Sequence, residues 1–417
     1  MKGKQITNKP MWQRMLFKCN LRKDFVAFFV VVPSSIITIC LIYHQIGQPL
    51  SKRPLFKRHF EKPVGKICRR IFDDDPERRE FFYEKYYQQD VLPSLNCSYN
   101  GNFSIYQSGD ILMVGNSSKK FHQNSIQCFY QGIYRNGDFQ PKFGSIKMIK
   151  FPFSKWPNDT DFIRVSCFHR QKMAKKGKPI FRDSFSNVKN SRLNFSKNAQ
   201  QHQRWNVVII GIDSLSHGLA KYRIPKTINR LKMMEAIFLN NLNKVGVNTY
   251  PNTIALLSGQ TLKPNESNFA SDFQLIWSDY QRHGYATMYV EDSKPSISTF
   301  NFLQPGFKPD AAPTLHYGRP FFQALYGDDS SANGLSYCKQ GRSNHEIIFK
   351  YLKQFVKNYE NHHPHFSFSI INEISHDGHS HLGHIDENLL QVVDEIIGNS
   401  PNTFVLIWSD HGQRSGA

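Results

Sequence analysis

Apolar residues follow a regular pattern in the second half of this chain. Between residues 205 and 417, short uninterrupted apolar runs alternate with stretches in which apolar residues recur at helical spacing. Such runs are typical of strands buried on both faces, and the stretches between them are typical of covering helices. The pattern therefore predicts an α/β fold with a parallel sheet whose strands cover residues 206–212, 286–290, 366–371 and 403–408.

Helical segments are predicted after the first of these strands. One segment begins near Pro251 and ends at Gly259, because proline near the start and glycine at the end mark helix boundaries. Another has apolar residues at helical spacing, namely Ile228, Leu231, Met234, Ile237 and Phe238.

The chain before residue 205 has a different pattern of apolar and polar residues. Residues 91–170 contain short alternating segments separated by turn signals, which predicts a small β-rich domain, most simply a β-sandwich. The alternative is a strand-rich extension of the following domain. Residues 171–204 are basic and lack apolar periodicity, so we interpret them as a linker or surface loop.

The N-terminal region contains a candidate membrane segment. Residues 25–43 carry no charge and have about the length needed to cross a bilayer, roughly 20 residues. We interpret them as a signal anchor, with a cytoplasmic tail at residues 1–24 and a polar, basic stalk at residues 44–90. A cleaved signal peptide is the alternative. A single-pass type II membrane protein with a lumenal or extracellular body is the resulting expectation.

Composition narrows the range of partners. The formal net charge of +20 favours acidic partners such as phosphate or sulfate esters, anionic glycans or lipid headgroups. Nucleic acid is disfavoured, because the sequence has neither a helix-turn-helix nor an aromatic RNA-binding signature.

Cysteine and asparagine patterns fit a secretory compartment. Because no Cys-x-x-Cys pair occurs, disulfides are favoured over a structural zinc site. Cys128 and Cys167 both lie in strand-like runs, which suits a bridge between strands. The other body cysteines are Cys68, Cys97 and Cys338. Glycosylation acceptors, all beyond the apolar segment, occur at Asn96, Asn102, Asn116, Asn158, Asn194 and Asn265.

Groups suited to metal binding follow several of the predicted strands. Asp213 ends the first strand, and Asp410 and His411 end the last. The carboxyl ends of parallel strands meet at one edge of a sheet, and mixed oxygen and nitrogen ligands hold Zn²⁺, or Mn²⁺ where oxygen dominates. A cluster that offers further ligands follows the strand at residues 366–371 and contains His376, Asp377, His379, His381 and His384.

Thr249 lies at the expected start of a helix, where free N–H groups and the helix dipole would stabilise a phosphate or sulfate. A hydroxyl ionised by a metal at that point could attack phosphorus or sulfur. Each feature also has a purely structural explanation. Asp213 and Thr249 could be helix caps, and the histidine cluster could be a solvated loop.

The order of these features resembles the alkaline phosphatase superfamily. Within that superfamily, residues 205–417 are most similar to the animal branch named domain of unknown function 229. The resemblance implies an alkaline-phosphatase-like α/β/α sandwich, incomplete at its C-terminal end. The motifs that carry it are Gly211-Ile212-Asp213-Ser214, Thr249-Tyr250-Pro251-Asn252, Leu256-Leu257-Ser258-Gly259, Glu291-Asp292, Ser375-His376-Asp377 and Ser409-Asp410-His411-Gly412.

By that resemblance, Asp213, Thr249, Asp410 and His411 would ligate one metal, with Thr249 as the nucleophile. Candidates for a second metal are His376, Asp377 and His379; Ser375 stands where a phosphodiesterase-like pattern has an Asp. Superfamily members continue past Asp-His-Gly with a further ligating His, so we expect the second site to be incomplete here.

Two hypotheses result. The first is a membrane-anchored, metal-dependent hydrolase or transferase acting on phosphate or sulfate esters. The second is a catalytically inactive glycoprotein of the same fold that acts in binding. The resemblance does not choose a substrate, although the absence of Cys at the nucleophile position argues against type I sulfatases.

Overall fold

The computed structural model describes most of the chain beyond the first 91 residues. For residues 28–31 it describes the backbone alone. The other described ranges are 92–95, 97, 103–115, 125–170, 177–189, 204–239, 242–262, 269–294, 298–302, 304–310, 312–327, 337–360 and 363–413.

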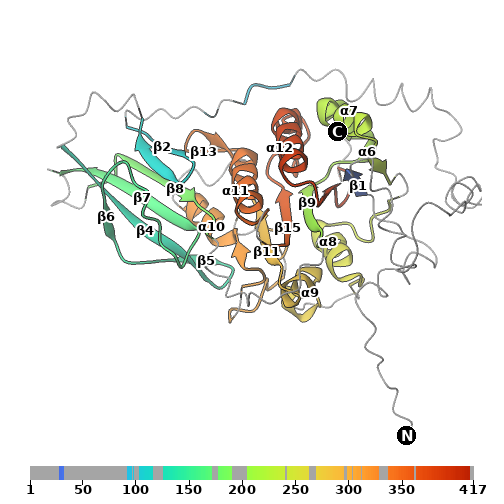
Figure 1. The fold of residues 1–417 in the computed structure, drawn as a ribbon, viewed down its shortest axis with the longest axis horizontal. Helices are drawn as coiled ribbons and strands as arrows, with labels where there is room; N and C mark the ends of the chain where they lie inside the picture. Colours follow the sequence, from blue (N-terminus) through green and yellow to red (C-terminus); the bar gives the residue numbers. More distant parts are fainter. Residues whose placement is uncertain are drawn as a thin grey trace, which may run out of the picture.

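A seven-stranded sheet forms the centre of the fold (Figure 1). Its order is β10-β1-β16-β9-β15-β11-β12, and the neighbours from β16 to β12 are parallel. All four predicted strands are present in this parallel part. The strand bounds are β1 (Phe28–Val31), β9 (Asn206–Ile212), β10 (Ile237–Phe238), β11 (Ala286–Glu291), β12 (His316–Tyr317), β15 (His365–Ile371) and β16 (Thr403–Trp408).

Helices cover both faces of this sheet, as an α/β fold requires. Val208 and Ile210 of β9 join the core formed with α6, α7, α10, α11 and α12, while Ile209 joins the core formed with α8 and α9. Side chains alternate between faces along a strand, so one apolar run serves both layers. The helix bounds are α6 (His217–Arg223), α7 (Pro225–Met233), α8 (Thr249–Ser258), α9 (Ile276–Arg282), α10 (Arg319–Gly327), α11 (Asn344–Tyr359) and α12 (Asp386–Asn399), with the 3-10 helices η5 (Ala270–Asp272) and η6 (Leu382–Ile385).

The β-rich part lies at one end of the molecule and packs against α10 (Figure 1). It has a core of its own, yet Ile133 and Phe162 belong to the main core of the α/β part. The expected β-rich domain is therefore present as a sheet fused to the neighbouring part. It consists of a hairpin, β2 (Ile105–Ser108) and β3 (Ile111–Val114), and a five-stranded sheet, β4 (Ile126–Asn136), β5 (Gln140–Phe143), β6 (Lys147–Ile149), β7 (Phe162–His169) and β8 (Phe181–Ser186).

Two sequence expectations about element boundaries are wrong. Residues 181–186, within the expected linker, form β8, which pairs with β7. Its polar residues are mostly buried, so its sequence lacks the usual alternation. The helical spacing predicted a helix that continues through Phe238. Instead, α7 ends at Met233, and the apolar pair Ile237–Phe238 forms β10. An apolar pair satisfies either period over so short a distance.

The candidate membrane segment differs from expectation where it is described. Its residues 28–31 form β1, antiparallel to both β10 and β16. The rest of the segment lies outside the described residues, as do the tail and the whole of the stalk. Within the described part of the chain, no helix combines the length and apolar character needed to cross a membrane.

Two disulfides join distant parts of the chain. Cys128 and Cys167 face each other in the β4–β7 register and are bonded, as the strand-like runs predicted. Cys97 is bonded to Cys338, which begins the small hairpin of β13 (Cys338–Lys339) and β14 (Arg342–Ser343). Cys68 lies outside the described residues. Of the glycosylation acceptors, Asn158 is described and exposed.

Candidate metal centre

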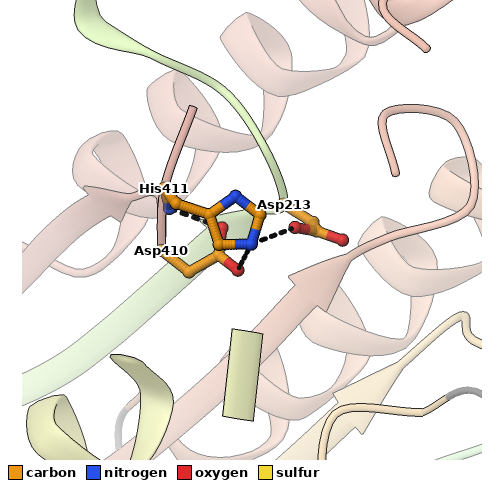
Figure 2. A group of neighbouring side chains, drawn as sticks. All are labelled: Asp213, Asp410 and His411. Atoms are coloured by element: carbon orange, nitrogen blue, oxygen red, sulfur yellow. Dashed lines mark hydrogen bonds and ion pairs between the residues drawn. The ribbon is translucent and has the colours of Figure 1, made fainter. Parts of the chain in front are cut away.

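The ends of two neighbouring strands bring three candidate ligands together. In the parallel pairing of β9 with β16, Gly211 faces Trp408, so the residues that follow each strand emerge side by side. Asp213, Asp410 and His411 point toward one another there (Figure 2). His411 Nε2 lies 3.1 Å from Asp410 Oδ2 and 3.9 Å from Asp213 Oδ1. All three side chains are buried.

Hydrogen bonding fixes the tautomer of His411. Its Nδ1 lies 2.8 Å from the carbonyl oxygen of Gly412. A carbonyl can only accept, so Nδ1 carries a proton, and Nε2 is the ring nitrogen that could present a lone pair to a cation. Metal-ligating histidines are commonly oriented in this way.

Asp410 is held by backbone donors on one oxygen only. Its Oδ1 accepts from the backbone N–H groups of Ser214, at 3.0 Å, and of His411, at 2.8 Å. Ser214 has a left-handed φ of 59°, a backbone conformation that is uncommon outside glycine and is concentrated at functional sites. This turn aims the Ser214 N–H at Asp410.

The remaining atoms fit a cation. Asp410 Oδ2 and His411 Nε2 are both buried and have no hydrogen-bond partner. A lone pair and a carboxylate oxygen so close together repel each other, and buried polar groups without partners are costly. With Asp213 they form the one group within the described residues whose ligand atoms are close enough to hold a metal ion. Two carboxylates and one imidazole suit Zn²⁺ or Mn²⁺.

Thr249 lies beside this group at the first residue of α8. Its hydroxyl donates to Asp213 Oδ1 over 3.4 Å. The preceding residue, Asn248, makes no side-chain capping hydrogen bond, and a helix N-terminus of this kind favours an anion. The four residues expected to share one metal therefore lie at one edge of the sheet.

Asn252 holds the loop that leads to Thr249. Its Oδ1 accepts from the N–H groups of Val245 and Gly246, and its Nδ2 donates to the carbonyls of Gly246 and Asn248. These four bonds use the full capacity of an amide side chain. Asn252 is buried one turn beyond Thr249 and acts as a positioning residue for it.

The three candidates for a second metal lie in different places. His376 lines the cavity that Asp213 and Thr249 also line. Asp377 is exposed and lies 2.5 Å from His376 Nδ1. His379 is buried, but it is not among the residues that line this cavity.

An acidic group forms the wall behind the cavity. Glu373 lines the cavity directly, and Asp292 lies behind it with Oδ1 accepting from the N–H groups of Asn372 and Glu373. Burial, reinforced by the neighbouring Glu373 carboxylate, raises the pKa of Asp292 to about 8. Burial also raises the pKa of Glu373. At neutral pH the inner carboxyl, Asp292, is therefore mainly protonated.

Comparison with known families identifies the family of this chain. The family model described as a protein of unknown function, DUF229, matches residues 94–417. The chain belongs to this family. Membership in DUF229 is consistent with the alkaline phosphatase superfamily suggested by the sequence motifs. A search of curated proteins found no match.

Sequence reasoning on this DUF229 chain singled out the candidate metal ligands but little of the rest of the cavity. It singled out the residues that end β9 and β16, and Thr249 at the start of α8. It missed Asn372 and the positioning role of Asn252, and it gave Glu373 no role in the cavity. The sequence did contain a signal for this part of the cavity. Asn372 and Glu373 come directly after β15, and ligands bind at the carboxyl ends of parallel strands.

Proposed function

We propose that this protein is a metal-dependent hydrolase or transferase of phosphate or sulfate esters, with Thr249 as the nucleophile. The observation that carries the proposal is the 3.4 Å contact between the Thr249 hydroxyl and Asp213. This hydroxyl lies at a helix N-terminus, directly beside a buried group of two carboxylates and one imidazole. The anion-binding and metal-binding features therefore meet at one hydroxyl.

Asp213, Asp410 and His411 would hold the metal, which we expect to be zinc. A bound metal supplies Lewis acidity, stabilising a hydroxyl oxygen as an anion and the charge that develops on the ester. Thr249 Oγ attacks phosphorus or sulfur while its proton leaves toward Asp213 Oδ1. The bond to the ester oxygen breaks, and the leaving alcohol takes up a proton from water. The N–H groups at the start of α8 receive the non-bridging oxygens. Water then releases the group from Thr249, or an acceptor alcohol does so in a transferase.

The proposed location is the lumen of the secretory pathway or the cell surface. Two disulfides are present in the body, and such bonds persist in oxidising compartments. Residues 25–43 would anchor the chain as a type II membrane protein, and the exposed Asn158 would be open to glycosylation. The substrate would be an anionic ester, and nucleic acid remains disfavoured.

The second candidate function is that of an inactive glycoprotein which keeps the fold for binding. One observation favours it. Within the described residues only Asp213, Asp410 and His411 form a metal-holding group, whereas many hydrolases of phosphate esters use two metals. A single metal would leave the departing oxygen without a second electrophile.

Metal content and esterase activity separate these functions. We expect the purified full-length protein to bind zinc stoichiometrically by plasma mass spectrometry and to hydrolyse an aryl phosphate or aryl sulfate. His411→Gln should lose the metal, while His283→Gln, which changes an exposed histidine, should retain it. Thr249→Ala should retain the metal but lose at least about a hundredfold in kcat/KM, because it removes the nucleophile.

Thr249→Ser is the matched control for the nucleophile, because it keeps a hydroxyl at the same position. It should recover part of the activity lost in Thr249→Ala. Activity that is unchanged in Thr249→Ala would refute the nucleophile assignment. Stoichiometric zinc without turnover of either ester would favour the binding function.

A further inference from the structure

The cavity next to Thr249 extends away from the metal ligands to a polar wall. This wall is built from residues 298–302 and 304 and from the residues that follow β15. The turn at residues 298–302 is fixed to the sheet, because the Thr299 N–H donates to Glu291 Oε2 at the end of β11. Ser298 Oγ also donates to Asn301 Oδ1 within the turn. The wall is thus a preformed surface.

Three side chains on this wall have buried atoms without hydrogen-bond partners. They are Thr299 Oγ1, Gln304 Oε1 and Glu373 Oε2, and all three residues line the cavity. Thr299 and Glu373 are 5% and 3% exposed. Leaving buried polar groups without hydrogen-bond partners is unfavourable. A ligand that supplies hydrogen-bond donors would remove this cost.

The unsatisfied atoms define the chemistry of that ligand. A carboxylate and an amide oxygen only accept, and a threonine hydroxyl can accept as well as donate. No lysine or arginine is among the described residues that line the cavity, despite the strongly basic composition. A second phosphate or sulfate would therefore meet mainly hydrogen-bond acceptors, with His376 as the one described lining residue able to carry a positive charge. A group carrying several hydroxyls would satisfy all three atoms.

Aromatic side chains and the volume of the cavity further restrict the chemical class of the ligand. Phe302 lines the cavity and is 44% exposed, and Tyr250 lines it nearby. Their rings offer an apolar surface for the carbon face of a cyclic polyol. The cavity measures about 200 Å³, below the range of roughly 300–1,000 Å³ that is usual for drug-sized ligands. One ring or a short polyol fits this space better than a polymer or a lipid.

We propose that the alcohol portion of the substrate is a small polyhydroxylated group, such as a single sugar, seated on Thr299, Gln304, Glu373 and Phe302. The inference rests on the proposed reaction at Thr249, because that reaction would place the alcohol of the ester in this cavity. An alcohol bearing one ammonium group is the competing ligand. It would pair its charge with Glu373 and offer three N–H donors from one nitrogen, whereas a polyol offers donors spread over several carbons.

Binding can be measured without turnover. Saturation-transfer NMR on the zinc-loaded full-length protein would use methyl glucoside and ethanolamine as probes. We expect a signal from methyl glucoside that weakens about tenfold in apparent affinity in Thr299→Val and in Gln304→Leu, since each removes one hydrogen bond. Thr253→Val is the matched control. Thr253 also has a buried hydroxyl without a partner, but it does not line the cavity.

Turnover gives a second readout. The ratio of kcat/KM for the phosphate ester of methyl glucoside to that for phenyl phosphate should fall about tenfold in Thr299→Val and stay unchanged in Thr253→Val. Equal glucoside binding in all variants, no glucoside binding, or a preference for ethanolamine would overturn the inference. Glucoside binding with no turnover of either ester would overturn the proposed reaction while supporting the subsite.

Discussion

Asp410 and Asp292 are both buried, but they differ in the groups that surround their carboxyl oxygens. Asp410 has one oxygen fixed by backbone N–H groups, and its other oxygen faces His411 Nε2. Asp292 also accepts two backbone N–H groups, but its neighbours Glu291 and Glu373 are acidic. Burial and these like charges favour the neutral acid at Asp292. Its protonation state therefore makes stability depend on pH.

Asp292 should make the protein less stable as pH rises. Its folded pKa of about 8 lies above the ordinary 3.8, so the folded state binds more protons than the unfolded state between these values. The free energy of unfolding should fall across this window, by at most about 1.4 kcal/mol per pH unit, and level off above pH 8. Asp292→Asn mimics the neutral acid and should flatten this fall. Urea unfolding from pH 5 to pH 9, with a chelator present, measures it.

The exposed Asp394 provides the control for this experiment. It forms a surface ion pair with Arg230, and both side chains are 40% exposed. Asp394→Asn should leave the pH dependence as in the wild type. A slope in Asp292→Asn equal to that of the wild type would show that this carboxyl is ionised throughout the range.

At the scale of elements, apolar runs in sequence predicted the strands that are buried on both faces. β9 and β15 were predicted because nearly all their residues are buried, most of them apolar. β8 was not predicted, since its Arg182, Asp183 and Ser184 are polar and its burial depends on pairing with β7. Local pattern therefore predicts a strand whose buried positions are apolar and misses one whose buried positions are mostly polar.

The segment at residues 25–43 contains a β-strand in the structure, but its composition suits a membrane-spanning helix. The same residues cannot form both at once. In the structure its residues 28–31 pair with β16, whereas a segment that crosses a bilayer must satisfy its backbone internally as a helix. We expect the helix in membranes, because the whole run is apolar. Full-length protein expressed in cells should then stay in the membrane pellet after alkaline carbonate extraction.

Charge placed in this segment tests the expectation. Val30→Arg should release much of the protein, because an arginine at the helix centre costs roughly 2.5–3.5 kcal/mol of insertion. Lys52→Arg, in the stalk, keeps the charge and should change nothing. Complete release of the wild-type protein by carbonate would rule out the anchor and leave β1 as the role of this segment.

At the scale of the whole molecule, sequence predicted which strand ends meet but only part of what surrounds them. Asp213, Asp410 and His411 could be placed together because parallel strands align their carboxyl ends. Glu373 and Thr299 could not, since their meeting in one cavity depends on the path of the turn at residues 298–302. Loop paths depend on tertiary packing that local sequence does not encode.

The contacts between the β-rich part and the α/β part could not be predicted from the sequence either. Asp161, just before β7, reaches into the α/β part, where its Oδ2 lies 2.6 Å from His316 Nδ1 and accepts from the Tyr351 hydroxyl at 2.9 Å. His316 Nε2 lies 2.8 Å from the Tyr359 hydroxyl. All four side chains are buried. This polar network joins β12 and α11 to the β-rich sheet.

Breaking this network should therefore destabilise the whole molecule. Asp161→Ala would leave the His316 and Tyr351 donors buried without an acceptor, so we expect a loss of about 3 kcal/mol or more in the free energy of unfolding. Asp159→Ala is the matched control two residues earlier, because its exposed carboxylate accepts only a surface bond from Tyr134. That control should cost less than about 0.5 kcal/mol. Equal losses in the two variants, measured by urea unfolding, would show that the sheet is held to the α/β part by its apolar contacts alone.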